Sequence, residues 1–212
     1  MRKKILILGL IAVGMLVSMC SYAVTFSDLS TEHWAYSYIT SLVEKGIISG
    51  YPDGTYKPEN TVSRAEFMKL IMTALHDEEG YFKSVEGEHW ATPYFKEAEE
   101  KEYLMNGTEE NDWDIEITRL EMANILAQVS IGNSIFNYSP LEEEIKFSDV
   151  ETLGDMSKSY IEFITHNKFI SGYPDGTFGP DRTMTRAECA TIISRFIDVK
   201  EKMGRMNGGY DD

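Results

Sequence analysis

The chain has 212 residues, of which 42% are hydrophobic and 12% aromatic, and its formal net charge at pH 7 is −15. A charge this negative argues strongly against nucleic acid as a partner, because proteins bind the phosphate backbone through clusters of Lys and Arg. The two cysteines exclude a disulfide scaffold, since one of them, Cys20, lies in a segment that we expect to be removed.

Residues 1–23 have the pattern of a secretion signal. Three basic residues precede an apolar stretch, 5–17, that is short for a membrane span, and 21–23 (Ser-Tyr-Ala) form a small-x-small cleavage site. Cleavage removes three basic residues and no acidic one, which changes the net charge from −15 to −18. We expect a secreted protein with no later membrane span. The alternatives are an uncleaved anchor or a lipoprotein joined at Cys20, although Met19 is large for that role.

Two segments of the chain are nearly identical. Residues 46–56 read GIISGYPDGTY and residues 168–178 read KFISGYPDGTF, and a Ser/Thr-Arg-Ala-Glu tetrad follows each at the same offset of 122 residues, at 63–66 and 185–188. An offset held over separated landmarks indicates duplicated structural units. A third copy lies between them, with Thr-Arg-Leu-Glu at 118–121 but without the Tyr-Pro-Asp-Gly turn.

We therefore predict three repeats, 26–75, 82–130 and 147–197, followed by a flexible tail over 198–212. Each repeat reads as helix, ordered loop, helix, because apolar residues at helical spacing flank turn residues. Ser/Thr-x-x-Glu in each tetrad predicts a capping box at the start of the second helix. One such hairpin cannot bury both of its apolar stripes alone, so the fold class is predicted as a single all-α domain with a shared core.

An Arg occupies the first helical position after each capping residue, although capping does not require it and the helix dipole disfavours it there. These residues are Arg64, Arg119 and Arg186. Two interpretations stay open at this point. In the first, each Arg is paired with an acidic neighbour such as Asp28 or Asp149. In the second, each Arg forms an anion site, in which the free amides of the helix start and the guanidinium together bind a carboxylate or phosphate.

Trp34 and Trp90 occupy equivalent positions in the first and second repeats. A flat aromatic face suits stacking on a sugar ring, whereas packing alone favours a place in the core. His33 and His89 precede them without a second ligand at fixed spacing, so no metal site is predicted. No nucleophile, phosphate-loop or cofactor motif is found, and we expect neither an enzyme nor a cofactor.

The ordered set of Phe-Ser-Asp-Leu, His-Trp-Ala, Gly-Tyr-Pro-Asp-Gly and Ser/Thr-Arg-Ala-Glu resembles the S-layer homology (SLH) domain over about residues 26–197. The resemblance implies a three-pronged spindle with pseudo-threefold symmetry. It implies a non-catalytic anchor at the cell wall, whose grooves bind secondary cell-wall polysaccharide, often carrying a pyruvate ketal, or a related peptidoglycan-linked glycan. The family's ligand-binding positions match nine residues here: Arg64, Arg119, Arg186, Asp28, Asp149, Trp34, Trp90, Gly50 and Gly172.

The chain departs from the family pattern in two units. The second repeat has Ser84 in place of the Asp and lacks Pro-Asp-Gly, and the third has Met156 in place of the Trp. We therefore expect one or two of the three grooves to bind. The alternative function is a surface protein-interaction or assembly protein, because no attached domain is expected after residue 197. A wall hydrolase is the third and weakest hypothesis.

Overall fold

The computed structural model describes residues 25–76, 80–104, 112–136 and 146–207, so the predicted signal peptide lies outside the described residues. Within these ranges the chain forms helices α1 (Tyr36–Glu44), α2 (Arg64–Leu75), α3 (Thr92–Glu100), α4 (Arg119–Gly132), α5 (Asp155–His166) and α6 (Arg186–Asn207). Each predicted repeat supplies two consecutive helices, which confirms the all-α class and the helix–loop–helix units.

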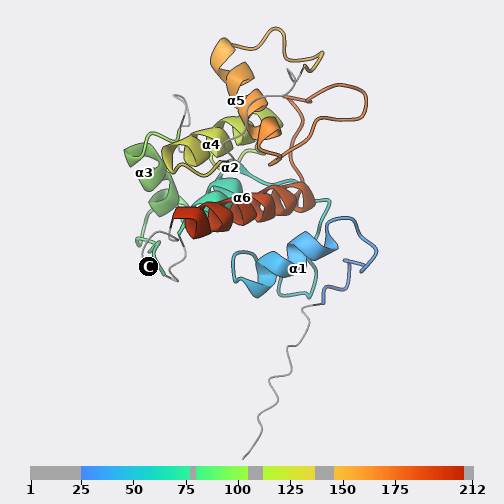
Figure 1. The fold of residues 1–212 in the computed structure, drawn as a ribbon. Helices are drawn as coiled ribbons and strands as arrows, with labels where there is room; N and C mark the ends of the chain where they lie inside the picture. Colours follow the sequence, from blue (N-terminus) through green and yellow to red (C-terminus); the bar gives the residue numbers. More distant parts are fainter. Residues whose placement is uncertain (1–24, 77–79, 105–111, 137–145, 208–212) are drawn as a thin grey trace, which may run out of the picture.

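The three hairpins follow one another around a ring. The first helix of each unit packs against the second helix of the unit before it, so α3 contacts α2 and α5 contacts α4. The ring closes because α1, at the beginning, packs against α6, at the end (Figure 1). None of the helices in the described ranges is long and apolar enough to cross a lipid bilayer.

A closed triangle of backbone hydrogen bonds lies at the centre of the ring. The N–H of Val62 donates to the carbonyl of Met184 (3.0 Å), Met184 N–H donates to Ile117 (3.2 Å), and Ile117 N–H donates to Val62 (2.9 Å). Each of these residues comes two positions before a second helix, so the triangle takes one residue from each unit. The expected pseudo-threefold symmetry is therefore present in the backbone itself.

All three predicted capping boxes are present. Ser63 Oγ accepts the N–H of Glu66 at 3.2 Å, while the Glu66 carboxylate accepts the N–H of Ser63 at 2.9 Å. The same reciprocal pair forms at the starts of α4 and α6. These bonds satisfy amide groups that a helix start leaves free, and they fix the position of the Arg that follows each cap.

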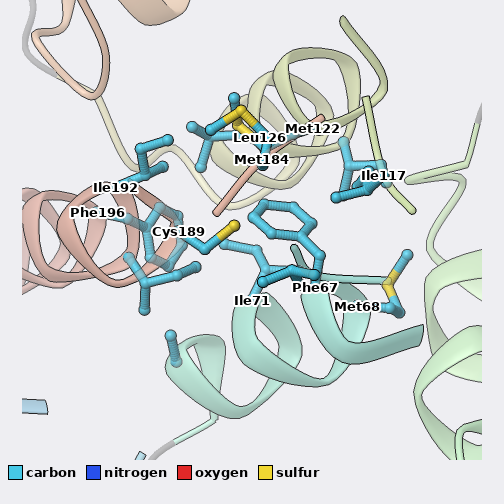
Figure 2. Close-up of a cluster of buried hydrophobic side chains, with 14 of the residues drawn as sticks. Phe67, Met68, Ile71, Ile117, Met122, Leu126, Met184, Cys189, Ile192 and Phe196 are labelled. Carbon is cyan, nitrogen blue, oxygen red and sulfur yellow. The ribbon is translucent and has the colours of Figure 1, made fainter. Parts of the chain in front are cut away.

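The core forms where the three second helices meet. Figure 2 shows side chains of α2, α4 and α6 converging on one cluster; it includes Phe67, Met68, Ile71, Met122, Leu126, Cys189, Ile192 and Phe196. Cys189 is buried at the position equivalent to Phe67, as expected of a small apolar residue, and burial raises the pKa of its thiol. Burying one large apolar side chain contributes about 1.5–3 kcal/mol, so this cluster holds the units together.

The predicted flexible tail is wrong for residues 198–207, which continue α6 to Asn207. Val199 packs against the core, and Lys200 Nζ donates to the carbonyls of Ala74 (3.2 Å) and Leu75 (2.7 Å). These are the last carbonyls of α2, which have no partner within their own helix. We attribute the order of this extension to the capping of α2 by Lys200. This contact joins two helices that are distant in the sequence, so no local sequence pattern predicts it.

Candidate ligand-binding groove

The three tetrad arginines lie at the junctions between units, and each reaches into the following unit of the ring. Arg64 of the first unit bonds to the second, Arg119 to the third, and Arg186 of the third unit bonds back to the first. We name each junction after its Arg. The junctions are equivalent in backbone position but differ in what surrounds the guanidinium.

At the Arg64 junction the guanidinium is neutralised by the protein. Its Nε donates to Glu121 Oε1 at 3.0 Å, its Nη2 donates to the same oxygen, and its Nη1 donates to the carbonyl of Asp112 at 3.2 Å. Burial alone would raise the pKa of Glu121, but the bonds from Arg64 and from the Thr118 cap outweigh it, so this pKa is lowered. The ion-pair interpretation is confirmed for Arg64, with Glu121 as the partner.

At the Arg119 junction the chain covers the guanidinium. Arg119 is only 4% exposed, and its Nη2 donates to the carbonyl of Ser171. The guanidinium carbon lies 4.9 Å from the ring centroids of Tyr173 and Phe178, and burial lowers the Arg119 pKa. This charge is not open to a ligand in the observed conformation.

At the Arg186 junction the guanidinium is held by neutral groups only. Its Nε donates to the carbonyl of Tyr56 at 2.9 Å and its Nη2 to that of Ser49 at 3.3 Å. It also lies over the rings of Tyr51 (4.9 Å) and Tyr56 (4.6 Å). No carboxylate in the described ranges forms an ion pair with Arg186, and the side chain is only partly buried. Its charge is therefore fixed in place and still able to attract an anion.

A cavity of about 920 Å³ lies at the Arg186 junction, and we call it the groove. Its lining comes from all three units, with Ser49 and Lys69 from the first, Trp90 and Tyr94 from the second and Arg186 from the third. The volume falls within the range of about 300–1,000 Å³ that is typical of small-molecule sites. Such a space is large enough for a small ligand beside the cation.

Trp34 and Trp90 are exposed. The interpretation that places these two side chains in the core is therefore wrong. Trp34 is 57% exposed and Trp90 43%, and Met156 at the equivalent position is 59% exposed. His33 and His89 precede the first helices as expected, and each Nδ1 accepts a backbone N–H two residues on. Trp90 lines the groove, which leaves its ring available for stacking on a ligand.

The order of units around the ring explains why the junctions differ. The groove combines the Arg of the third unit, the loop of the first and the tryptophan of the second, represented by Arg186, Ser49 and Trp90. Applying the same order by symmetry gives the expected composition of the other two junctions. By this order the Arg64 junction is expected to combine a neutralised Arg, the unit whose sequence lacks Pro-Asp-Gly, and Met156. The departures from the family pattern are thus assigned to one junction.

The same order of units assigns Trp34 to the Arg119 junction. This junction also contains the side chain of Arg195. Arg195 of α6 donates from Nη1 to the carbonyl of Phe169 at 3.3 Å and lies 5.8 Å from the Tyr38 ring centroid. In the first unit the equivalent position is Thr73, which lines the groove. A long cation therefore occupies space that a short side chain leaves open at the Arg186 junction.

Asp28 and Asp149 do not pair with the arginines, so the expectation that these two residues are the acidic partners is wrong. The two oxygens of Asp28 accept the N–H groups of Tyr56 and Lys57, both at 2.7 Å. Asp149 accepts those of Phe178 (2.8 Å) and Gly179 (2.7 Å) in the same way. Both carboxylates brace the Gly-Tyr-Pro-Asp-Gly loops, and any contact they make with a ligand stays a prediction.

Gly50 and Gly172 allow a close approach of an aromatic ring. A Cβ at Gly50 would lie 2.2 Å from Cε1 of Phe26, and one at Gly172 would lie 2.1 Å from Cε1 of Phe147. These two phenylalanines begin the Phe-Ser-Asp motifs, so each glycine permits the start of its unit to pack on its own loop. A direct contact between either glycine and a ligand is untested.

Sequence reasoning missed Lys69, which lines the groove next to Trp90. An alignment of the three repeats could have identified Lys69, because the equivalent residues, Asn124 and Thr191, are both uncharged. In the part of the chain that the structure describes, no group of three or more His, Cys, Asp or Glu side chains is arranged to hold a metal ion.

Comparison with known proteins agrees with this architecture. A family profile described as the S-layer homology domain matches residues 25–68 and 146–190, which lie in the first and third units. The first and third units of the chain belong to the S-layer homology domain family. Membership places it among cell-wall anchoring modules at the cell surface. The middle unit, which the profile does not match, adopts the same helix–loop–helix arrangement.

Several relatives share most of this chain. It is 29% identical over 183 residues to Cell surface glycoprotein 1 of Acetivibrio thermocellus, covering 86% of this chain and 6% of the relative. It is 29% identical over 178 residues to the Cellulosome-anchoring protein of the same organism, covering 76% and 36%. It is 29% identical over 179 residues to S-layer protein sap of Bacillus anthracis, covering 81% and 21%. The chain thus spans about a third or less of the length of these relatives.

Proposed function

We propose that this chain is a non-catalytic anchoring module that binds an acidic secondary cell-wall polysaccharide in the groove at the Arg186 junction. The observation that carries the proposal is the state of Arg186. Its guanidinium is positioned by two carbonyls, has no carboxylate partner in the described ranges and lines an open cavity next to an exposed Trp.

The groove suits a sugar that carries a carboxylate, such as a pyruvate ketal. Arg186 would bind the carboxylate, because charge-assisted hydrogen bonds are the strongest that a guanidinium forms. The Trp90 ring would stack on the sugar face, and backbone groups near Ser49 would bind hydroxyls. Losing the Arg186 contact should cost about 1.5–3 kcal/mol of binding free energy.

The other two junctions are proposed not to bind. Arg64 is already paired with Glu121, and Arg119 is only 4% exposed, so neither guanidinium offers a ligand an unpaired and accessible charge. The proposal therefore predicts one binding groove in each chain. This number lies within the one or two grooves expected from the sequence.

The test is co-sedimentation with purified wall sacculi of Arg186→Met and, as a matched control, Arg64→Met. We expect Arg186→Met to lose sedimentation and Arg64→Met to keep it. Equal binding of wild type and Arg186→Met would reject the role of the groove. If the wild type still sediments after the polysaccharide has been stripped from the wall, the partner is a protein or peptidoglycan, and the assembly-protein hypothesis is favoured instead.

A further inference from the structure

We propose that Lys69 forms a second anion-binding point in the groove, so that the preferred ligand carries two acidic groups. This inference rests on the proposed function and specifies its ligand class. Lys69 lies on the exposed side of α2 and lines the same cavity as Arg186. A ligand that spans the cavity can therefore contact both cations.

Lys69 is placed to act together with Trp90. Its ammonium lies 6.0 Å from the Trp90 ring centroid, at the outer limit of a cation–π contact. Such a contact holds the ammonium near the ring while leaving its hydrogen-bond donors free. A sugar stacked on Trp90 would therefore bring a substituent within reach of Lys69.

The charges lining the cavity leave two cations without an acidic partner. The remaining charged or titratable groups on these walls are engaged, with Lys45 paired to Glu201, His76 bonded to Glu97, and Glu66 capping its own helix at Ser63. Among the described residues, neither Arg186 nor Lys69 forms an ion pair. The formal net charge of −15 repels a doubly acidic ligand, so a groove that accepts one requires more than a single unpaired cation.

Among the three second helices, a cation at the position of Lys69 is specific to this junction. The equivalents of Lys69 are Asn124 and Thr191, which are uncharged and buried, whereas Lys69 is exposed. Packing requirements common to the three second helices therefore do not account for a Lys at this position. A role in the open groove does, because Lys69 is exposed and lines the cavity, whereas Asn124 and Thr191 are buried.

The test is isothermal titration with two synthetic probes. The mono-acid probe is a disaccharide with one pyruvate ketal, and the di-acid probe is the same disaccharide with a uronate as its second sugar. We expect wild type to bind the di-acid probe about tenfold more tightly, which corresponds to ~1.4 kcal/mol. Lys69→Thr, which introduces the residue of the third unit, should abolish this preference, and Lys69→Arg should keep it.

Lys45→Thr is the matched control, because Lys45 lines the same cavity but is paired with Glu201. It should leave the tenfold preference unchanged. The inference is overturned if wild type binds both probes equally, or if Lys69→Thr retains the preference. Failure of the proposed function is distinguishable, since in that case Arg186→Met would bind both probes as tightly as wild type does.

Discussion

Glu121 binds Arg64 through one carboxylate oxygen and caps α4 through the other. Oε1 accepts from the guanidinium at 3.0 Å and Oε2 accepts the N–H of Thr118 at 2.9 Å. Glu66, its equivalent in the first unit, caps α2 in the same way but forms no ion pair with Arg186 within the described ranges. The contact made by the capping Glu therefore distinguishes Arg64, which serves the fold, from Arg186, which remains available to a ligand.

Arg64→Met should destabilise the fold and leave wall binding intact. The change removes a partly buried ion pair, with Arg64 19% exposed, and leaves the Glu121 carboxylate without its cation. We expect a loss of about 1–3 kcal/mol in the free energy of unfolding, measured by chemical denaturation. A variant as stable as wild type would show that the ion pair contributes nothing to the fold.

Acid should destabilise the protein through Glu121 and Asp28. Burial opposes ionisation of both, but hydrogen bonds to their carboxylates prevail, so both folded-state pKa values are lowered. A lowered pKa contributes stability above the unfolded-state value of about 4, and that contribution is lost as the pH falls through the folded-state pKa. Thermal melts between pH 3 and pH 7 should show this loss, and Glu121→Gln should show a smaller one. An equal pH dependence in both proteins would contradict this assignment.

Gly50→Ala should destabilise the first unit more than Gly54→Ala does. A Cβ at Gly50 would meet the Phe26 ring at 2.2 Å, and overpacking of this kind costs about 1–3 kcal/mol. Gly54 has φ +79°, and a Cβ added there would have nothing within 4 Å, so only backbone strain of about 1–2 kcal/mol applies. Chemical denaturation of both variants gives the comparison, and the reverse order would show that Phe26 moves aside freely.

Lys200→Met should weaken the attachment of the α6 extension to α2. The ammonium donates to two terminal carbonyls of α2, and a cation at a helix C-terminus contributes about 0.3–1 kcal/mol. Hydrogen exchange of the last turn of α2 should become faster, whereas exchange at the start of α2 should not change. Unchanged protection at Leu75 would show that the bonds from Lys200 do not hold this end.

The fold could be predicted almost completely because its signals are local and repeated. Capping boxes, apolar stripes and loop glycines each depend on neighbours in the sequence, and the offset of 122 residues joins them into units. The helical extension over residues 198–207 could not be predicted, since its order depends on the distant carbonyls of Ala74 and Leu75.

The site could be predicted only in part. The sequence indicated Arg186 and Trp90 as candidate groove residues, and both line the open cavity, but it assigned the same role to Arg64 and Arg119. The difference depends on which side chain of the next unit meets each Arg, Glu121 in one case and a set of aromatic rings in another. These contacts across junctions depend on how the units are arranged around the ring. The repeat pattern in the sequence does not by itself predict that arrangement.

The central claim is that each chain has one groove and that Arg186 binds the ligand's acid there. The most direct measurement is isothermal titration with fragments of wall polysaccharide, before and after chemical removal of the pyruvyl group. We predict one site per chain for wild type, at least tenfold weaker binding for Arg186→Met, and a similar loss for the depyruvylated fragments. Three equivalent sites per chain, or wild-type affinity in Arg186→Met, would contradict the claim.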